Sequence, residues 1–249
     1  MAGLTAHAET SLDDILAKNH SAVFGQSEHA ELASIDIDLT ITESGHELTA
    51  WYRATADGRM RIDVFSGTDR VFSEGLDERG AWEWPVSQPA PSAVDHEGVG
   101  ALEHGIEFNL YSLAELRDRG HTVEWLGKET LLTVEYDVLK ITLQDGFETF
   151  RFTNAETGRV DASRDFRAFH PGIDATRQQL ETRYDRWQQT DGIVRATRSR
   201  TFELATEELI ATATVTRVAY NIAPARLHLT REFVPDGPPD SGPAHGAQD

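Results

Sequence analysis

Short segments in which apolar and polar residues alternate run from about Glu31 to Leu229, after one predicted helix over Leu12–Gly25. In Ala33–Ile41 every second residue is apolar, and Asp57-Gly58 is a hairpin turn signal before Met60-Arg61-Ile62. A period of two is typical of a β-strand with one solvent-facing side, and tight turns join antiparallel strands. The pattern therefore predicts a long antiparallel sheet whose apolar face must be covered by helices or by an apolar ligand.

Two amphipathic helices are predicted beside these strands. Ser11 is a suitable N-cap for the first helix, and Gly25 is a natural stop. Apolar residues between Val99 and Leu116 recur at spacings of three and four, which predicts a second helix. A change of parity between Val138 and Leu139 indicates a β-bulge, and Glu207–Val218 is predicted as one of the last strands.

The chain of 249 residues is long enough for one all-β unit, and no repeat or linker divides it. We expect a single domain over residues 10–235 and a Pro- and Gly-rich disordered tail over residues 236–249. Ala6-His7-Ala8 is similar to the small-residue end of a secretory signal. Residues 1–9 are therefore either the remnant of a signal peptide or a chance match.

Charge and composition exclude several classes of function. A net charge of −19 argues against nucleic acid as a partner, because a phosphate-binding surface needs clustered lysine and arginine. The absence of cysteine excludes disulfides and thiolate chemistry. No apolar run approaches the roughly 18 residues of a membrane span.

A catalytic signature is not apparent in the sequence. It has no Gly-x-Ser-x-Gly motif, no phosphate-binding loop, and no His-Glu-x-x-His pairing, although His96-Glu97 and Glu103-His104 lie close together. Asp36 and Asp38 share a strand face opposite Ile35 and Ile37, and we expect both to be solvated. We therefore predict no catalytic residues, no metal site and no cofactor.

Aromatic residues spread over many segments are the remaining candidates for a binding site. They pack a core, or a subset of them lines a cavity for an apolar ligand. Trp51 breaks the alternation of Leu48, Ala50 and Tyr52 and should face the opposite side of its strand. The predicted cavity residues are Trp51, Trp82, Trp84, Phe108, Leu110, Trp125, Phe150 and Phe152.

A succession of local matches resembles the LolA/LolB-type lipoprotein-carrier superfamily. The matches span roughly Leu12 to Pro235 and include no single diagnostic motif. They are Ile15–His20, the Trp82 strand ending at Pro85, the helix before Gly120, Val123–Glu129, Phe150–Thr157 with Gly158-Arg159, Tyr184–Trp187 before Asp191-Gly192-Ile193, Asn221, and Phe233-Val234-Pro235.

The resemblance implies a strongly curved antiparallel sheet that forms an unclosed half-barrel, with helices covering its concave face. It further implies a monomeric periplasmic carrier that holds lipid or lipoprotein acyl chains non-covalently, with a helical lid and membrane-bound donor and acceptor proteins as partners. Two alternatives stay open. One is a sensory or scaffolding domain of the same fold that binds a protein, and the other is a hydrolase on a barrel-like fold.

Overall fold

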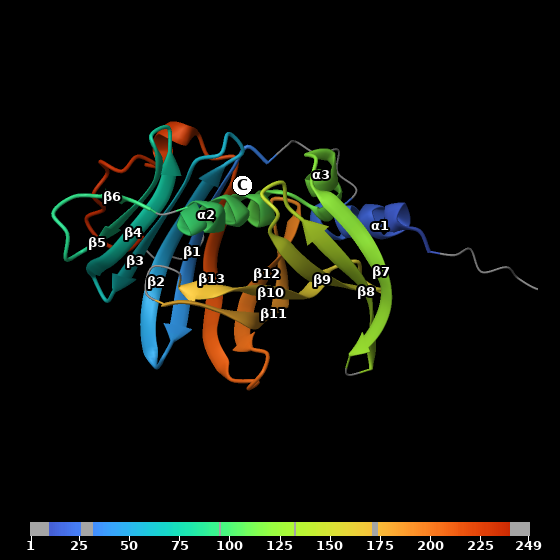
Figure 1. The fold of residues 1–249 in the computed structure, drawn as a ribbon. Helices are drawn as coiled ribbons and strands as arrows, with labels where there is room; N and C mark the ends of the chain where they lie inside the picture. Colours follow the sequence, from blue (N-terminus) through green and yellow to red (C-terminus); the bar gives the residue numbers. More distant parts are fainter. Residues whose placement is uncertain (1–9, 26–31, 95, 132, 171–173, 240–249) are drawn as a thin grey trace, which may run out of the picture.

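A computed structural model describes residues 10–25, 32–94, 96–131, 133–170 and 174–239. Within these ranges the chain forms three α-helices and one antiparallel sheet of 13 strands that curves around helix α2 (Figure 1). Strands β6 and β7 are the two edges, so the sheet is not closed into a barrel. The predicted fold class is confirmed.

The sheet consists of two meanders joined where the first and last strands pair. Its order is β6-β5-β4-β3-β2-β1-β13-β12-β11-β10-β9-β8-β7. The first meander contains β1 (Ser34–Glu43), β2 (His46–Thr55), β3 (Met60–Ser66), β4 (Asp69–Asp77), β5 (Gly80–Pro85) and β6 (Ser92–Ala93). The second contains β7 (Thr122–Leu131), β8 (Val134–Thr142), β9 (Glu148–Asn154), β10 (Val160–His170), β11 (Asp174–Thr190), β12 (Ile193–Glu203) and β13 (Leu209–Tyr220).

The helices differ from expectation in one respect. Helix α1 (Leu12–Phe24) begins after a capping box between Ser11 and Asp14, as its sequence predicts. The single helix expected over Val99–Leu116 is instead two, α2 (His96–Leu110) and α3 (Leu113–Asp118). The reason is Ser112, whose side chain accepts from the backbone of Glu115 and starts a new helix.

The predicted bulge at Val138 and Leu139 lies on the neighbouring strand. Trp125 pairs with Leu139 and Gly127 pairs with Val138, so the extra residue is Leu126 of β7. The parity change in β8 is therefore matched by a bulged partner rather than by an insertion in β8 itself.

We call the sheet face that carries the helices the inner face and the opposite one the outer face. On β1, Ile35 and Ile37 point inward and pack in the core beneath α2. Asp36 and Asp38 point outward, but they are only 8% and 4% exposed, so the expectation that they are solvated is wrong. Arg217 of β13 covers them, with Nη2 2.9 Å from Asp36 and Nε 2.6 Å from Asp38.

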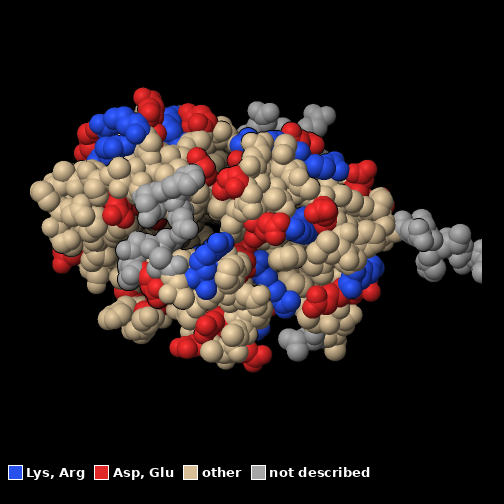
Figure 2. All heavy atoms as spheres, viewed as in Figure 1, with Lys and Arg blue, Asp and Glu red and all other residues tan. Residues whose placement is uncertain are grey.

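Acidic and basic side chains are interleaved over the molecular face seen in Figure 2. In the described part of the chain, no helix is both long and apolar enough to cross a membrane. The predicted signal remnant, residues 1–9, and residues 240–249 of the predicted tail lie outside the described residues.

Candidate functional site

Helix α2 covers an apolar area of the inner face. Leu102, Ile106 and Leu110 on its buried side are at most 5% exposed. They belong to one core cluster with residues of β1, β2, β3, β5 and β13, namely Ile35, Ile37, Tyr52, Ala54, Met60, Ala81 and Tyr220. Partly buried apolar residues that pack against this cluster, including Leu39, Ile62 and Val218, extend the apolar inner face. The helix therefore covers an apolar surface, as the resemblance implied for helices on the concave face of the sheet.

A few polar contacts hold the middle and end of α2. The Tyr52 hydroxyl donates to the Gly105 carbonyl at 3.0 Å. Arg195 of β12 donates to the side-chain and backbone oxygens of Asn109, at 2.8 and 2.5 Å. Burial raises the pKa of Tyr52, so this hydroxyl stays protonated as a donor.

A charged cluster links α2 to the second meander. His104 Nε2 lies 2.7 Å from the Asp145 carboxylate in the β8–β9 turn, and its ring stacks on Phe147. Glu107 lies 2.7 Å from Arg119 and 3.1 Å from His121. Burial opposes ionisation of Glu107, but Arg119 and His121 outweigh it and lower its pKa. The charged residues and the two histidines line a hollow of about 300 Å³. Their ion pairs connect α2 to the segment before β7 and to the β8–β9 turn.

A carboxyl with a perturbed pKa lies on the same inner face. Glu74 of β4 is paired in register with Ile62 on one side and with Glu83 on the other. Burial, and secondarily the charge of Glu83, raises the pKa of Glu74 to about 7. Among the described carboxyl groups of the inner face, Glu74 alone has a pKa raised to about 7.

The second core lies under α1 and α3. Ile15 and Leu16 of α1 pack with Leu113 and Leu116 of α3 against inner-face residues of β7 and β8. Those strand residues are Val123, Leu139 and Ile141 together with the partly buried Trp125. Phe108 of α2 packs at the edge of this cluster, beneath the Arg151 guanidinium at 4.0 Å from its ring centre.

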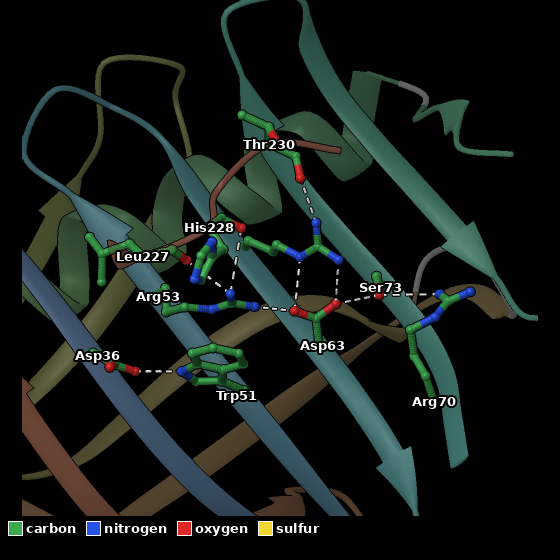
Figure 3. A network of polar contacts seen from close by, with 10 residues as sticks. Asp36, Trp51, Arg53, Asp63, Arg70, Ser73, Leu227, His228 and Thr230 are labelled. Carbon is green, nitrogen blue, oxygen red and sulfur yellow. Dashed lines mark hydrogen bonds and ion pairs between the residues drawn. The ribbon is translucent and has the colours of Figure 1, made fainter. Parts of the chain in front are cut away.

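On the outer face, an arginine network is buried beneath the C-terminal segment (residues 224–239). Asp63 accepts from Arg53 and bidentately from Arg61, with distances of 2.8 and 2.7 Å for Arg61 (Figure 3). The Leu227 carbonyl accepts from Arg53 at 2.9 Å, and the Thr230 carbonyl accepts from Arg61 at 2.5 Å. Burial lowers the pKa of Arg53 to about 10, which leaves it charged at neutral pH.

Three predicted cavity residues lie around this network. Trp51 stacks under Arg53 and donates to Asp36 at 2.5 Å, and it faces away from Ala50 and Tyr52, as predicted. Trp82 is fully buried with Arg61 5.1 Å from its ring centre, whereas Trp84 lies further out beneath Arg70. Phe233 of the C-terminal segment contacts Trp51 edge-on. This part of the outer face is closed by the chain itself.

A second part of the outer face is open. A hollow of about 550 Å³ crosses strands β7 to β11, and its apolar lining includes Val138, Phe150 and Phe152. Phe152 pairs with Val138, whose neighbour Leu139 points into the α1–α3 core, so the hollow lies opposite those helices. The other lining residues are Leu126, Gly127, Lys128, Glu129, Arg164, Asp165, Phe166, Gln179 and Leu204.

The eight predicted cavity residues therefore fall into three groups. Phe108, Leu110 and Trp125 lie on the helix side, with Leu110 in one core and the other two at the second. Trp51, Trp82 and Trp84 surround the outer arginine network. Phe150 and Phe152 line the open hollow. The structure does not bring the eight together, and their role in ligand binding stays a prediction.

Sequence reasoning missed the polar groups of both faces. Arg53 and Arg61 face the same side of the sheet as Trp51 and pair with each other in register. The alternation in β2 and β3 could therefore have shown that both arginines lie on one face. His104 and Asp145 are 41 residues apart, and no local pattern connects them. Among the described residues, no group of three or more histidine or carboxylate side chains is placed to hold a metal ion.

The fold is that of LolA-type half-barrels. A LolA superfamily protein from Nitrosomonas europaea superposes with a TM-score of 0.59 at 14% identity, over 90% of this chain and 100% of that one. A domain from Vibrio parahaemolyticus assigned to outer membrane lipoprotein sorting gives 0.53 at 8% identity, over 86% and 95% of the two chains. No protein-family profile matches the chain, and neither does any curated protein sequence. At these identities the likeness concerns the fold alone.

Proposed function

We propose that this protein is an extracytoplasmic carrier that binds the acyl chains of a lipid or lipoprotein non-covalently on the inner face, with α2 as a displaceable lid. The observation that carries the proposal is the apolar contact between α2 and the first meander. Leu102, Ile106 and Leu110 cover an apolar surface that continues beyond the helix through Leu39 and Ile62. A ligand that replaces α2 there needs only apolar chains.

The energetics favour exchange of the lid for acyl chains. Uncovering three buried aliphatic side chains costs roughly 5–9 kcal/mol, at about 1.5–3 kcal/mol each. One sixteen-carbon chain with about 15 buried methylenes gains roughly 12 kcal/mol. Helix α2 also contains Gly98, Gly100 and Gly105, and each interior glycine weakens a helix by about 1 kcal/mol relative to alanine. The polar contacts of α2 with Tyr52, Arg195 and Asp145 add about 1 kcal/mol each to the cost of displacement. A cargo with several acyl chains gains more than this total.

The fold comparisons support a cargo that carries acyl chains. The Vibrio parahaemolyticus domain is assigned to outer membrane lipoprotein sorting, and by analogy a cargo with several acyl chains suits this protein. From the same structural analogy we infer that the protein acts outside the cytoplasm. Membrane-bound proteins that deliver and receive the cargo would be its partners.

Native mass spectrometry with a synthetic triacylated lipopeptide tests the proposal. We expect a 1:1 complex with the natural sequence and a reduced complex with Ile62→Gln, which makes the inner face polar beside α2. Val86→Gln is the matched control, because Val86 is 63% exposed in the segment after β5 and lies outside the core clusters. Absence of any complex with the natural sequence would overturn the proposed function.

A further inference from the structure

The open hollow on the outer face is separate from the inner face and from α2. It is lined by residues of β7, β8, β9, β10 and β11 and by Leu204. Leu126 and Phe166 at its margin are 55% and 52% exposed, so large apolar side chains there are in contact with solvent. An apolar hollow of this volume with a few polar groups at its edge is a candidate ligand site.

The dimensions of the hollow suit one extended chain. Five neighbouring strands are separated by four spacings of about 4.8 Å, so the hollow extends roughly 19 Å across them. The volume of about 550 Å³ suits a single long aliphatic chain. A peptide added to edge strand β7 would run along that strand, whereas the hollow crosses the strands.

Arg164 supplies a polar end to the hollow. Its Nε donates to Glu181 at 2.7 Å, and its guanidinium carbon lies 4.5 Å from the Phe152 ring centre. The Glu129 carboxylate forms a second, longer ion pair with Nη1 at 4.0 Å, beyond hydrogen-bond range. Both terminal nitrogens of Arg164 therefore have no hydrogen bond within the described residues, and the side chain is 30% exposed. A carboxylate is the group that such a guanidinium binds best.

We propose that this hollow binds one long-chain fatty acid, with its carboxylate at Arg164 and its chain along Phe152 and Phe150 toward Leu126. The apolar floor and the length of the hollow account for the chain, and Arg164 accounts for the free acid. The site requires no movement of α2, so it does not depend on the proposed carrier function.

Titration with the fluorescent fatty acid cis-parinaric acid, followed by displacement with palmitate or palmitic acid methyl ester, tests the site. We expect 1:1 binding that is lost in Leu126→Asp, because this substitution places a carboxylate in the chain's path. Binding should also be lost in Phe166→Asp, because a carboxylate two residues from Arg164 on β10 repels the bound carboxylate. Val86→Asp is the matched control, since Val86 is an apolar residue outside the hollow that is at least as exposed as Leu126 and Phe166. Binding that survives both hollow variants would overturn the proposal.

The head group is tested separately with Arg164→Gln. Loss of a charge-assisted hydrogen bond should weaken palmitate binding at least about tenfold and leave the methyl ester unchanged. Glu181 keeps Arg183 as a partner in this variant, at 2.6 Å, so the fold should survive. Equal weakening of both ligands would contradict the assignment of Arg164. Failure of fatty acid binding with intact lipopeptide uptake would reject this site alone, and specific binding of an extended peptide instead would overturn it in favour of a protein partner.

Discussion

Arg53 and Asp63 form a fully buried ion pair on the face of the sheet opposite α2. Both side chains are 0% exposed, as is Arg61, the second arginine on the same carboxylate. Burial opposes ionisation of Asp63, but the two guanidiniums outweigh it and hold its pKa below the usual range. Carbonyls of the C-terminal segment complete the coordination of the arginines. The network therefore holds the C-terminal segment against the middle of the first meander.

Replacement of Asp63 by asparagine should destabilise the protein strongly. Two buried guanidiniums would then lack their shared countercharge, which costs about 3–5 kcal/mol. Urea denaturation measures the change. Asp57→Asn is the matched control, since its ion pair with Arg59 is exposed and should contribute at most about 1 kcal/mol. Equal effects of the two substitutions would show that the buried network is not formed as described.

Stability should depend on pH through Glu74. Its folded pKa of about 7 exceeds its ordinary value of 4.5, so the folded state binds more protons between these values. The free energy of unfolding contributed by this group therefore falls as pH rises from about 4.5 to 7 and is level above. Glu74→Gln should raise stability at pH 8 by up to about 3 kcal/mol, with no gain below pH 4.5. Denaturation curves at both pH values check this, and a gain independent of pH would exclude titration as its cause.

Two glycine-to-alanine substitutions should have opposite effects. A Cβ at Gly105 in α2 would meet only the Tyr52 hydroxyl at 3.9 Å, so Gly105→Ala should stabilise the helix by up to about 1 kcal/mol. At Gly75 a Cβ would lie 2.6 Å from the Met60 carbonyl and 2.8 Å from the Trp82 ring, so Gly75→Ala should cost about 1–3 kcal/mol. Thermal melting compares the two. Stabilisation by both would contradict the close packing of β4 on Trp82.

The packing of the C-terminal segment on the outer face should depend on Phe233. This side chain stacks on His228 and contacts Trp51. Phe233→Ala should cost about 2 kcal/mol, since this side chain is only partly buried. It should also shift tryptophan fluorescence to longer wavelength as water reaches Trp51. The neighbouring Val234→Ala, at 57% exposure, should change stability by no more than about 0.5 kcal/mol. A similar small effect for Phe233→Ala would indicate that the segment does not cover this face.

Local sequence patterns were sufficient to predict an antiparallel sheet and the orientation of Trp51 away from Leu48, Ala50 and Tyr52. They predicted the capped helix α1 because Ser11 and Asp14 are near neighbours in sequence. The break between α2 and α3 was missed because helical spacing continues through Ser112, and only its capping contact interrupts the helix.

The candidate sites could not be predicted because they depend on contacts distant in sequence. The pairs of Asp36 with Arg217 and of Arg53 with Leu227 join residues more than 170 positions apart. Asp36 was expected to be solvated, since alternation identifies a face but not what covers it. For the same reason, the predicted aromatic residues could be assigned to faces only after the register of all 13 strands was known.

The most direct test of the carrier account is to lock α2 in place. The chain contains no cysteine, so His104→Cys and Asp145→Cys create a unique pair where these side chains now meet. A short bis-methanethiosulfonate reagent would bridge them, and a reductant would release the bridge in the same sample. Uptake of triacylated lipopeptide should be lost in the bridged protein and return after reduction. Undiminished uptake while the bridge is intact would contradict the claim that α2 must move to admit the cargo.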